Sequence, residues 1–181
     1  MMKTSTTKQR LFEIMERVDP NFTQNKPKFI IPIGISGSGK SHWIKSLEGQ
    51  GFEVVSPDEI RRELTGSISD QTRNKDVFPI AFQRTIDFLN AGKSVIFDAT
   101  NVGSYHRKQM LDTFKEKVSI EFDAFAKVFD VDPEISKERI RKDIEGGVDR
   151  SDVPPEAVDR QHQNFTNDLD KIEADGYTLI N

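Results

Sequence analysis

The sequence predicts an α/β domain, in which a parallel sheet of about five strands carries helices on both faces. Short apolar runs such as "KFIIPI" and "KSVIF" alternate with longer segments whose apolar residues recur at helical spacing. Several of these segments begin at proline or serine and end at glycine, which is typical of helix boundaries. A helix between successive strands is the connection that parallel neighbours require.

The N-terminal segment, residues 1–27, is predicted to be a helix followed by a linker. Leu11, Ile14, Met15 and Val18 fall at helical spacing within residues 7–18. The following stretch "DPNFTQNKPK" is rich in Asn, Pro and Lys and indicates a linker. We expect the helix to pack against the main domain, residues 28–181, or against a partner.

The main domain is predicted to alternate strands and helices. Strands are expected at residues 29–33, 52–56, 93–97, 118–131 and 177–181, and helices at 40–51, 57–64, 78–92, 104–117, 133–147 and 154–176. Residues 66–77 are polar and predict a loop. Pro32 conflicts with a central first strand, because proline cannot donate a ladder hydrogen bond, so one bond is expected to be missing there.

Composition narrows the class of protein. A chain of 181 residues predicts one domain, and 26 basic against 30 acidic residues exclude a uniformly basic nucleic-acid binder. Cysteine is absent, which excludes disulfides and thiolate metal sites. No stretch approaches a membrane span, and "MMKTSTTKQR" lacks the apolar core of a signal peptide. We expect a soluble, cytoplasmic protein with no membrane partner, and the sequence leaves its oligomeric state open.

The stretch "GISGSGKS", residues 34–41, matches the full pattern G-x-x-x-x-G-K-[ST] between a strand and a helix. Glycines let such a loop turn its backbone N–H groups onto phosphate oxygens, and the helix start adds to the attraction. Lys40 is expected to reach the β- and γ-phosphates, and the Ser41 hydroxyl to ligate Mg²⁺. The expected nucleotide-binding residues are Gly34, Ser36, Gly37, Ser38, Gly39, Lys40 and Ser41.

ATP is the expected donor. A GTPase should carry N-K-x-D for guanine, whereas "NKDV" at residues 74–77 has its Asp at the wrong place and comes too early.

Two carboxylates follow the next two strands, Asp58 in "VVSPDEIRREL" and Asp98 in "SVIFDATN". In an open α/β sheet, ligands bind outside the carboxyl ends of the strands. Asp58 could therefore accept a proton from an acceptor hydroxyl, and Arg61 could hold an acceptor phosphate. Asp98 could touch the Mg²⁺ shell or orient the acceptor. A well-capped helix start with local ion pairs, and an Asp that caps a turn, would also explain these residues.

Read together, these motifs resemble the P-loop kinases of the polynucleotide 5′-hydroxyl kinase type, as found in bacteriophages and nucleic-acid repair enzymes. The resemblance covers roughly residues 28–165. It implies the P-loop kinase fold, with Asp58 as general base and Arg61 as the acceptor-phosphate contact. It also implies substrate-binding roles for Asp98, Thr100 and Asn101, which form the D-x-T-N motif, and for Arg107 at the start of the next helix. A solvated arginine on the helix surface is the alternative for Arg107.

The resemblance further implies a mobile basic lid over the donor phosphates, at about residues 134–153. Arg150 is the expected lid cation, which would act with Asp58 and Lys40 in catalysis. Arg139 and Arg141 are alternatives, and a solvated helix face would explain any one of the three.

The expected function is ATP- and Mg²⁺-dependent transfer of the γ-phosphate to a hydroxyl of a nucleic acid, with the 5′-OH end of DNA or RNA as the first expectation. One alternative is a kinase that acts on a small molecule or on a modified base hydroxyl in DNA. Another is a non-catalytic ATP-binding adaptor whose N-terminal helix recruits a partner.

Overall fold

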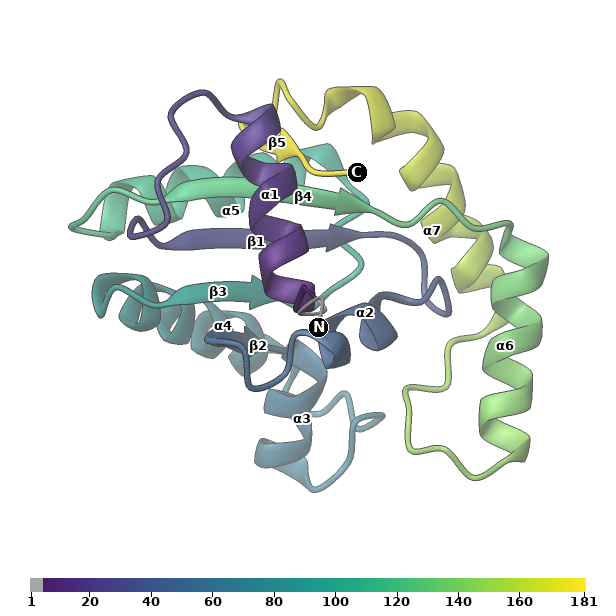
Figure 1. Ribbon diagram of the computed structural model, residues 1–181. Helices are drawn as coiled ribbons and strands as arrows, with labels where there is room; N and C mark the ends of the chain where they lie inside the picture. Colours follow the sequence, from purple (N-terminus) through teal and green to yellow (C-terminus); the bar gives the residue numbers. More distant parts are fainter. Residues whose placement is uncertain (1–4) are drawn as a thin grey trace.

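The computed structural model describes residues 5–181 and contains a five-stranded sheet in the order β2-β3-β1-β4-β5 (Figure 1). All four strand pairs are parallel. The strands are β1 (Lys28–Ile33), β2 (Phe52–Val55), β3 (Ser94–Phe97), β4 (Asp123–Val128) and β5 (Thr178–Leu179). The helices are α1 (Thr7–Val18), α2 (Lys40–Ser46), α3 (Pro57–Thr65), α4 (Asn74–Asn90), α5 (Ser104–Lys117), α6 (Pro133–Glu145) and α7 (Pro155–Asp168), followed by the 3₁₀ turn η1 (Leu169–Lys171). The predicted α/β architecture is confirmed.

The sheet has a separate apolar cluster on each face. In Figure 1, α1 crosses in front of the strands, and α4 and α5 lie behind them. The front cluster joins α1 and α2 to the sheet through Leu11, Met15, Ile30, Ile44, Leu47, Ile96, Phe125 and Ile180. The rear cluster includes Phe29, Ile31, Ile33, Val77, Leu89, Phe97, Met110 and Phe114. Both faces are therefore buried, as a parallel sheet requires.

Helix α1 spans the predicted residues 7–18 and packs on the main domain, the first of the two expected arrangements. Thr6 caps it: the Thr6 hydroxyl accepts from the Gln9 amide, and the Gln9 side chain accepts from the Thr6 amide. Leu11 is nearly buried and Met15 fully buried, whereas Val18 is exposed. The helix thus supplies core side chains to the sheet.

Several predicted boundaries are wrong: the helices predicted at 40–51 and 154–176 end at Ser46 and Asp168, and α4 and β4 differ as well. Helix α4 begins at Asn74, inside the predicted loop 66–77, and carries Pro79 within it. Val77 is fully buried in the rear cluster, and this packing favours the extra turn despite the proline. Strand β4 is shorter than residues 118–131, because only residues 123–128 pair with β1 and β5.

Pro32 lies where β1 has lost its partner on one side. The pairing of β1 with β3 is registered at Phe29↔Val95 and Ile30↔Ile96 only. The Pro32 carbonyl points to this same side, where it accepts a hydrogen bond from the Asn101 side chain at 2.8 Å. Since the N–H and C=O of one strand residue face the same neighbour, the missing donor falls beyond the end of the ladder. The proline therefore costs no bond to β4.

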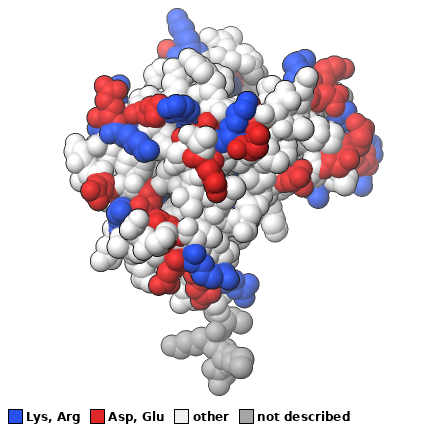
Figure 2. Space-filling model, turned by 90° about the horizontal axis from the view of Figure 1, so that it is seen from above, with Lys and Arg blue, Asp and Glu red and all other residues white. Residues whose placement is uncertain are grey.

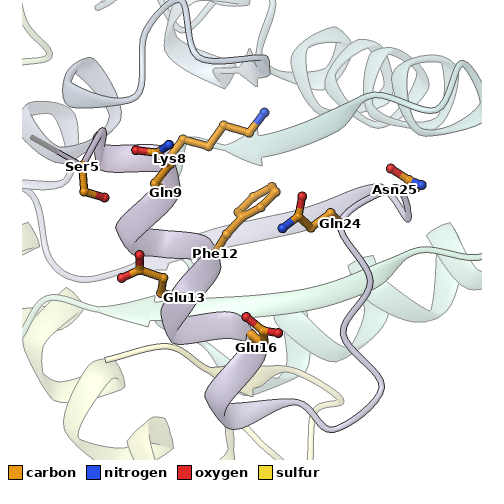
Figure 3. Close-up of a pocket in the computed structure, with 8 residues that line it drawn as sticks. All are labelled: Ser5, Lys8, Gln9, Phe12, Glu13, Glu16, Gln24 and Asn25. Atoms are coloured by element: carbon orange, nitrogen blue, oxygen red, sulfur yellow. The ribbon is translucent and has the colours of Figure 1, made fainter. Parts of the chain in front are cut away.

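Two further observations concern the surface. A hollow of about 650 Å³ runs along α1 and is lined by Ser5, Lys8, Gln9, Phe12, Glu13, Glu16, Gln24 and Asn25 (Figure 3). None of the predicted site residues lines it. Within residues 5–181, no helix is long and apolar enough to cross a membrane.

Candidate functional site

Strand order brings three predicted segments to one edge of the sheet. β3 lies between β2 and β1, so the residues that follow β3 are flanked by the start of α3 and by residues 34–41. Asp98 therefore lies between Asp58 and the phosphate-binding loop. The arrows of β1, β3 and β4 in Figure 1 point toward this edge, beside which α6 lies.

The loop formed by residues 34–41 packs too tightly for side chains at two of its glycines. A Cβ on Gly34 would lie 2.6 Å from Ser38 Oγ and 2.9 Å from the Phe129 carbonyl oxygen. Gly37 has φ +78°, and its Cβ would lie 2.7 Å from the Ser136 carbonyl oxygen of α6. The loop therefore turns back on itself and rests directly on α6, as a cradle for phosphate requires.

Lys40 is nearly buried and folds back onto this loop. Its Nζ donates to the carbonyl oxygens of Gly34 at 2.8 Å and Ile35 at 2.7 Å. Burial lowers the pKa of Lys40 to about 8, although nearby Asp98 opposes the change, and the positive charge of Arg150 adds to it. The ammonium is thus held among dipoles that a phosphate can replace.

The loop amide of Ser36 is also occupied by protein. It donates to the Gln161 side-chain oxygen of α7 at 2.8 Å. A phosphate contact through this amide therefore requires Gln161 to move.

The two carboxylates have different surroundings. Burial raises the pKa of Asp98, Lys40 opposes the change, and the charges of Asp58 and Glu59 add to it. Asp58 is half exposed, and its Oδ1 accepts from Arg61 Nη1 at 2.5 Å. Asp58 is therefore open to a ligand, whereas Asp98 is half-buried and lies near the Lys40 ammonium.

Arg61 is buried within α3 and its neighbours. Besides Asp58, it donates through Nε to the Asn74 side-chain oxygen at 2.9 Å. These hydrogen bonds use the Nε and Nη1 donors of the Arg61 guanidinium. Within residues 5–181, no protein hydrogen bond from Nη2 is found, so one edge of the guanidinium is left for a ligand.

Two residues of the D-x-T-N segment, Thr100 and Asn101, make hydrogen bonds within the protein. Asn101 adopts φ 53°, and its amide nitrogen donates to the carbonyl oxygens of Pro32, Phe97 and Ala99. The Thr100 carbonyl accepts from the Gly34 amide at 3.0 Å. Since a side-chain amide has two N–H groups and three acceptors already share them, Asn101 has no donor left for a substrate. The amide nitrogen of Asn101 thus serves the protein itself, and a substrate role through its Oδ1 stays a prediction.

Arg107 is the clearest correction. It is fully buried, so the structure shows neither the predicted substrate contact nor the alternative of a solvated position on the helix surface. All five of its N–H donors are used: they bind the Asp175 carboxylate and the carbonyl oxygens of Asn101, Val102 and Asp168. Arg107 is therefore not available to a substrate.

The three arginines of the lid segment have different surroundings. Arg139 donates to the Gly37 carbonyl at 3.2 Å, and Arg150 pairs with Asp143 at 2.6 Å while its charge acts on Lys40. Arg141 is exposed and pairs with Glu138 and Glu145. Arg139 and Arg150 thus lie on the side of the loop, and Arg141 is engaged along its own helix.

Sequence reasoning missed Gln161 and Asp175. Gln161 lies on a polar helix face, and Asp175 precedes the glycine that ends a helical segment, so neither carries a motif. Their partners, Ser36 and Arg107, are more than 65 residues away. Only the fold brings them together.

The donor set at the loop would suit Mg²⁺ that is held mainly by a nucleotide, with Ser41 at the exposed start of α2 and Asp98 after β3 as the protein's oxygen ligands. Within residues 5–181, no group of three or more His, Cys, Asp or Glu side chains could hold a metal. Magnesium needs few protein ligands when phosphates and water complete its shell, so one hydroxyl and one carboxylate would be enough.

Comparison with known proteins agrees with this geometry. No curated protein matches the chain. A component of the Pnkp1/Rnl/Hen1 RNA repair complex superposes with a TM-score of 0.70 at 24% identity, over 84% of this chain and 48% of that one. In a second structure of this complex the values are 0.56 and 28%, over 66% and 40%. The structure of AvrRxo1-ORF1:-ORF2 with ATP gives 0.63 at 17%, over 92% and 56%.

This chain thus spans less than half the length of the repair-complex chains. The five-stranded parallel sheet and its flanking helices have the P-loop kinase fold. The model of the AAA domain family matches residues 29–167, and the chain belongs to this family.

Proposed function

We propose that the protein is an ATP- and Mg²⁺-dependent kinase that phosphorylates the 5′-OH end of a nucleic acid. The observation that carries the proposal is the order Lys40–Asp98–Asp58 across three neighbouring segments of the sheet edge. In this order, Lys40 and the half-exposed carboxylate of Asp58 lie on opposite sides of the half-buried carboxylate of Asp98. Such an arrangement has a donor side and an acceptor side.

In the proposed reaction, Asp58 accepts the proton of the acceptor hydroxyl. The hydroxyl oxygen forms a bond to the γ-phosphorus, the bond to the bridging oxygen breaks, and ADP leaves. Lys40 holds the phosphates, and Ser41 and Asp98 hold Mg²⁺, which neutralises phosphate charge when bound. Arg150, with Arg139 as the alternative, stabilises the charge of the transferred group.

The choice of a nucleic-acid end as the acceptor rests on Arg61, on the structural comparisons and on the surface charge. Arg61 has one free edge beside Asp58, where it can bind the phosphate that follows a 5′-terminal nucleoside. The likeness to components of an RNA repair complex supports a polynucleotide end. Lys and Arg side chains are interspersed with acidic ones on the face seen in Figure 2, so this face offers no broad basic surface to a nucleic-acid backbone.

The experiment is phosphoryl transfer from γ-labelled ATP to matched acceptors. The panel holds 5′-OH DNA and RNA oligonucleotides, 5′-phosphorylated controls, a nucleoside, its 3′-phosphate and small alcohols. Label on 5′-OH ends alone supports the proposal. Label on 5′-phosphorylated DNA indicates a base hydroxyl, and label on small alcohols alone indicates a small-molecule kinase.

Asp58→Ala is the decisive variant, and Glu63→Ala on the same helix is its control. Asp58→Ala should lower transfer at least about 100-fold with ATP affinity retained, because general-base catalysis typically contributes 10²–10⁴-fold. Glu63→Ala should stay within about threefold, since Glu63 pairs with Arg84 on the surface. Near-normal transfer by Asp58→Ala would leave Asp58 with a capping role only. ATP binding without transfer to any acceptor would favour the adaptor.

A further inference from the structure

The buried ion pair of Arg107 and Asp175 lies outside the proposed catalytic residues, but Arg107 also binds the backbone of Asn101 and Val102, in the segment that begins at Asp98. Arg107 is 1% exposed and Asp175 is 6% exposed. The Arg107 Nε donates to Asp175 Oδ2 at 2.9 Å, and Nη2 lies 2.8 Å from the same oxygen. The other carboxylate oxygen accepts from Ser104 Oγ at 2.6 Å.

The remaining donors of Arg107 grip the segment that follows β3. Nη1 donates to the carbonyl oxygens of Asn101 at 3.0 Å and Val102 at 2.8 Å. Nη2 donates to the Asp168 carbonyl at the end of α7 at 2.7 Å. One guanidinium therefore ties the 98–102 segment to the C-terminal part of the domain.

The 98–102 segment is hydrogen-bonded in turn to the end of β1, to the start of the phosphate-binding loop and to the end of β2. Asn101 binds the end of β1 through Pro32, and the Thr100 carbonyl accepts from Gly34, the first residue of the phosphate-binding loop. Asp98 begins the same segment, and its own amide donates to the Val55 carbonyl at the end of β2. A shift of this segment would move Asp98 relative to both Lys40 and Asp58.

We propose that Arg107 and Asp175 are a positioning pair, which sets Asp98 and the start of the phosphate-binding loop in register for phosphoryl transfer. The inference rests on the proposed function. Positioning of reacting groups carries much of a phosphoryl-transfer reaction, and a misplacement of about 1 Å can cost about 100-fold. The pair touches neither substrate, so its loss should act on the rate of transfer rather than on ATP affinity.

The structure offers a matched control at the opposite end of the strands, where β1 and β4 begin. Lys28 is fully buried and pairs with Asp123 at 2.8 Å, at the first residues of β1 and β4. Asp123→Asn and Asp175→Asn therefore both remove the acidic partner of a buried cation. Both should lower the melting temperature.

The experiment compares kcat per folded molecule, ATP affinity and amide hydrogen exchange in the two variants. We expect Asp175→Asn to lower kcat about tenfold or more, with the ATP Kd within about threefold, and Asp123→Asn to keep kcat within about twofold. The reference is the Phe129 amide, which donates to the Ile33 carbonyl on the other side of β1. Relative to it, the Gly34 amide should exchange at least about tenfold faster in Asp175→Asn.

Unchanged kcat and unchanged Gly34 exchange in Asp175→Asn would overturn the proposal, whatever the melting temperature. If Asp175→Asn does not fold, Ser104→Ala removes one bond to the carboxylate, and Gly34 exchange at the wild-type rate then counts against the proposal. Hydrogen exchange needs no substrate. If the wild type transfers no phosphate but Gly34 exchange responds, the kinase assignment fails and the positioning pair stands.

Discussion

Arg62 of α3 and Asp149 of the segment between α6 and α7 form an ion pair, with Nη2 and Oδ2 2.7 Å apart. The pair joins the acceptor side of the candidate site to the lid segment. Both side chains are substantially exposed, and Arg62 also contacts Glu59. The ion pair therefore holds the lid segment against α3 only weakly, since exposed ion pairs contribute about 0–1 kcal/mol.

Asp149→Ala should loosen the lid without destabilising the protein. We expect the amides of residues 146–153 to exchange about two- to fivefold faster, because an exposed pair contributes at most about 1 kcal/mol, and the melting temperature to stay within about 2 °C. Hydrogen exchange and thermal unfolding measure the two effects. A large fall in melting temperature would mean that the lid carries core stability.

ATP affinity should fall as the pH rises through about 8. Burial lowers the pKa of Lys40 to about 8, so the ammonium loses its proton in this range in the free protein. Bound phosphates favour the charged lysine, so the ATP Kd should rise by up to about tenfold per pH unit above this value. Titration between pH 7 and 9 tests this, with Lys40→Ala as the control, whose Kd should be higher and nearly flat with pH.

Asp98→Asn should trade activity for stability. Burial raises the pKa of Asp98 above its ordinary value of 3.8, so the folded state binds this proton more tightly than the unfolded chain. The free energy of unfolding therefore falls as the pH rises through the raised pKa, and asparagine removes this loss. Melting curves at pH 4–8 should show the variant gaining on the wild type toward neutral pH, while transfer falls about tenfold or more. A constant difference in melting temperature across this range would contradict the assignment.

Arg150→Ala and Arg141→Ala should differ strongly. Arg150 acts on the Lys40 charge, whereas Arg141 is engaged by Glu138 and Glu145 on the surface of α6. Transfer should fall about 100-fold in Arg150→Ala and stay within about threefold in Arg141→Ala, because loss of one charge-stabilising group typically costs about 10²–10³-fold. Single-turnover rates at saturating ATP measure this. Equal losses in both variants would favour general electrostatic attraction over a lid cation.

Met15→Ala should destabilise the domain by about 2–4 kcal/mol, because it removes a fully buried side chain from the front cluster. Val18→Ala on the same helix is the control: its side chain is exposed, so the loss should stay within about 0.5 kcal/mol. Urea unfolding measures both. If Met15→Ala has no effect, α1 does not stabilise the sheet.

The sequence predicted what depends on local pattern. Helix α1, the phosphate-binding loop and the α/β alternation follow from residue spacing and from glycine and proline chemistry, and these are local. The predicted start of α4 was wrong, because residues 66–77 are mostly polar, whereas the burial of Val77 depends on tertiary packing.

The misplaced residues share one cause. Arg107 and Asn101 were expected at a substrate because the motifs that contain them resemble those of the polynucleotide 5′-hydroxyl kinase family. Their partners, Asp175 and the carbonyl of Pro32, lie 68 and 69 residues away in the chain. No pattern in one sequence shows that a charge will be matched at such a distance inside the protein.

The front cluster also sets the order of events during synthesis. It joins Leu11, near the start of the chain, to Phe125 and Ile180. Helix α1 leaves the ribosome long before the strands that complete its docking face, so its apolar side lacks its full set of native partners until residue 180 has emerged. Closure of this face is thus a late step, and a ribosome stalled within α7 would display a chain whose first helix has not yet docked fully.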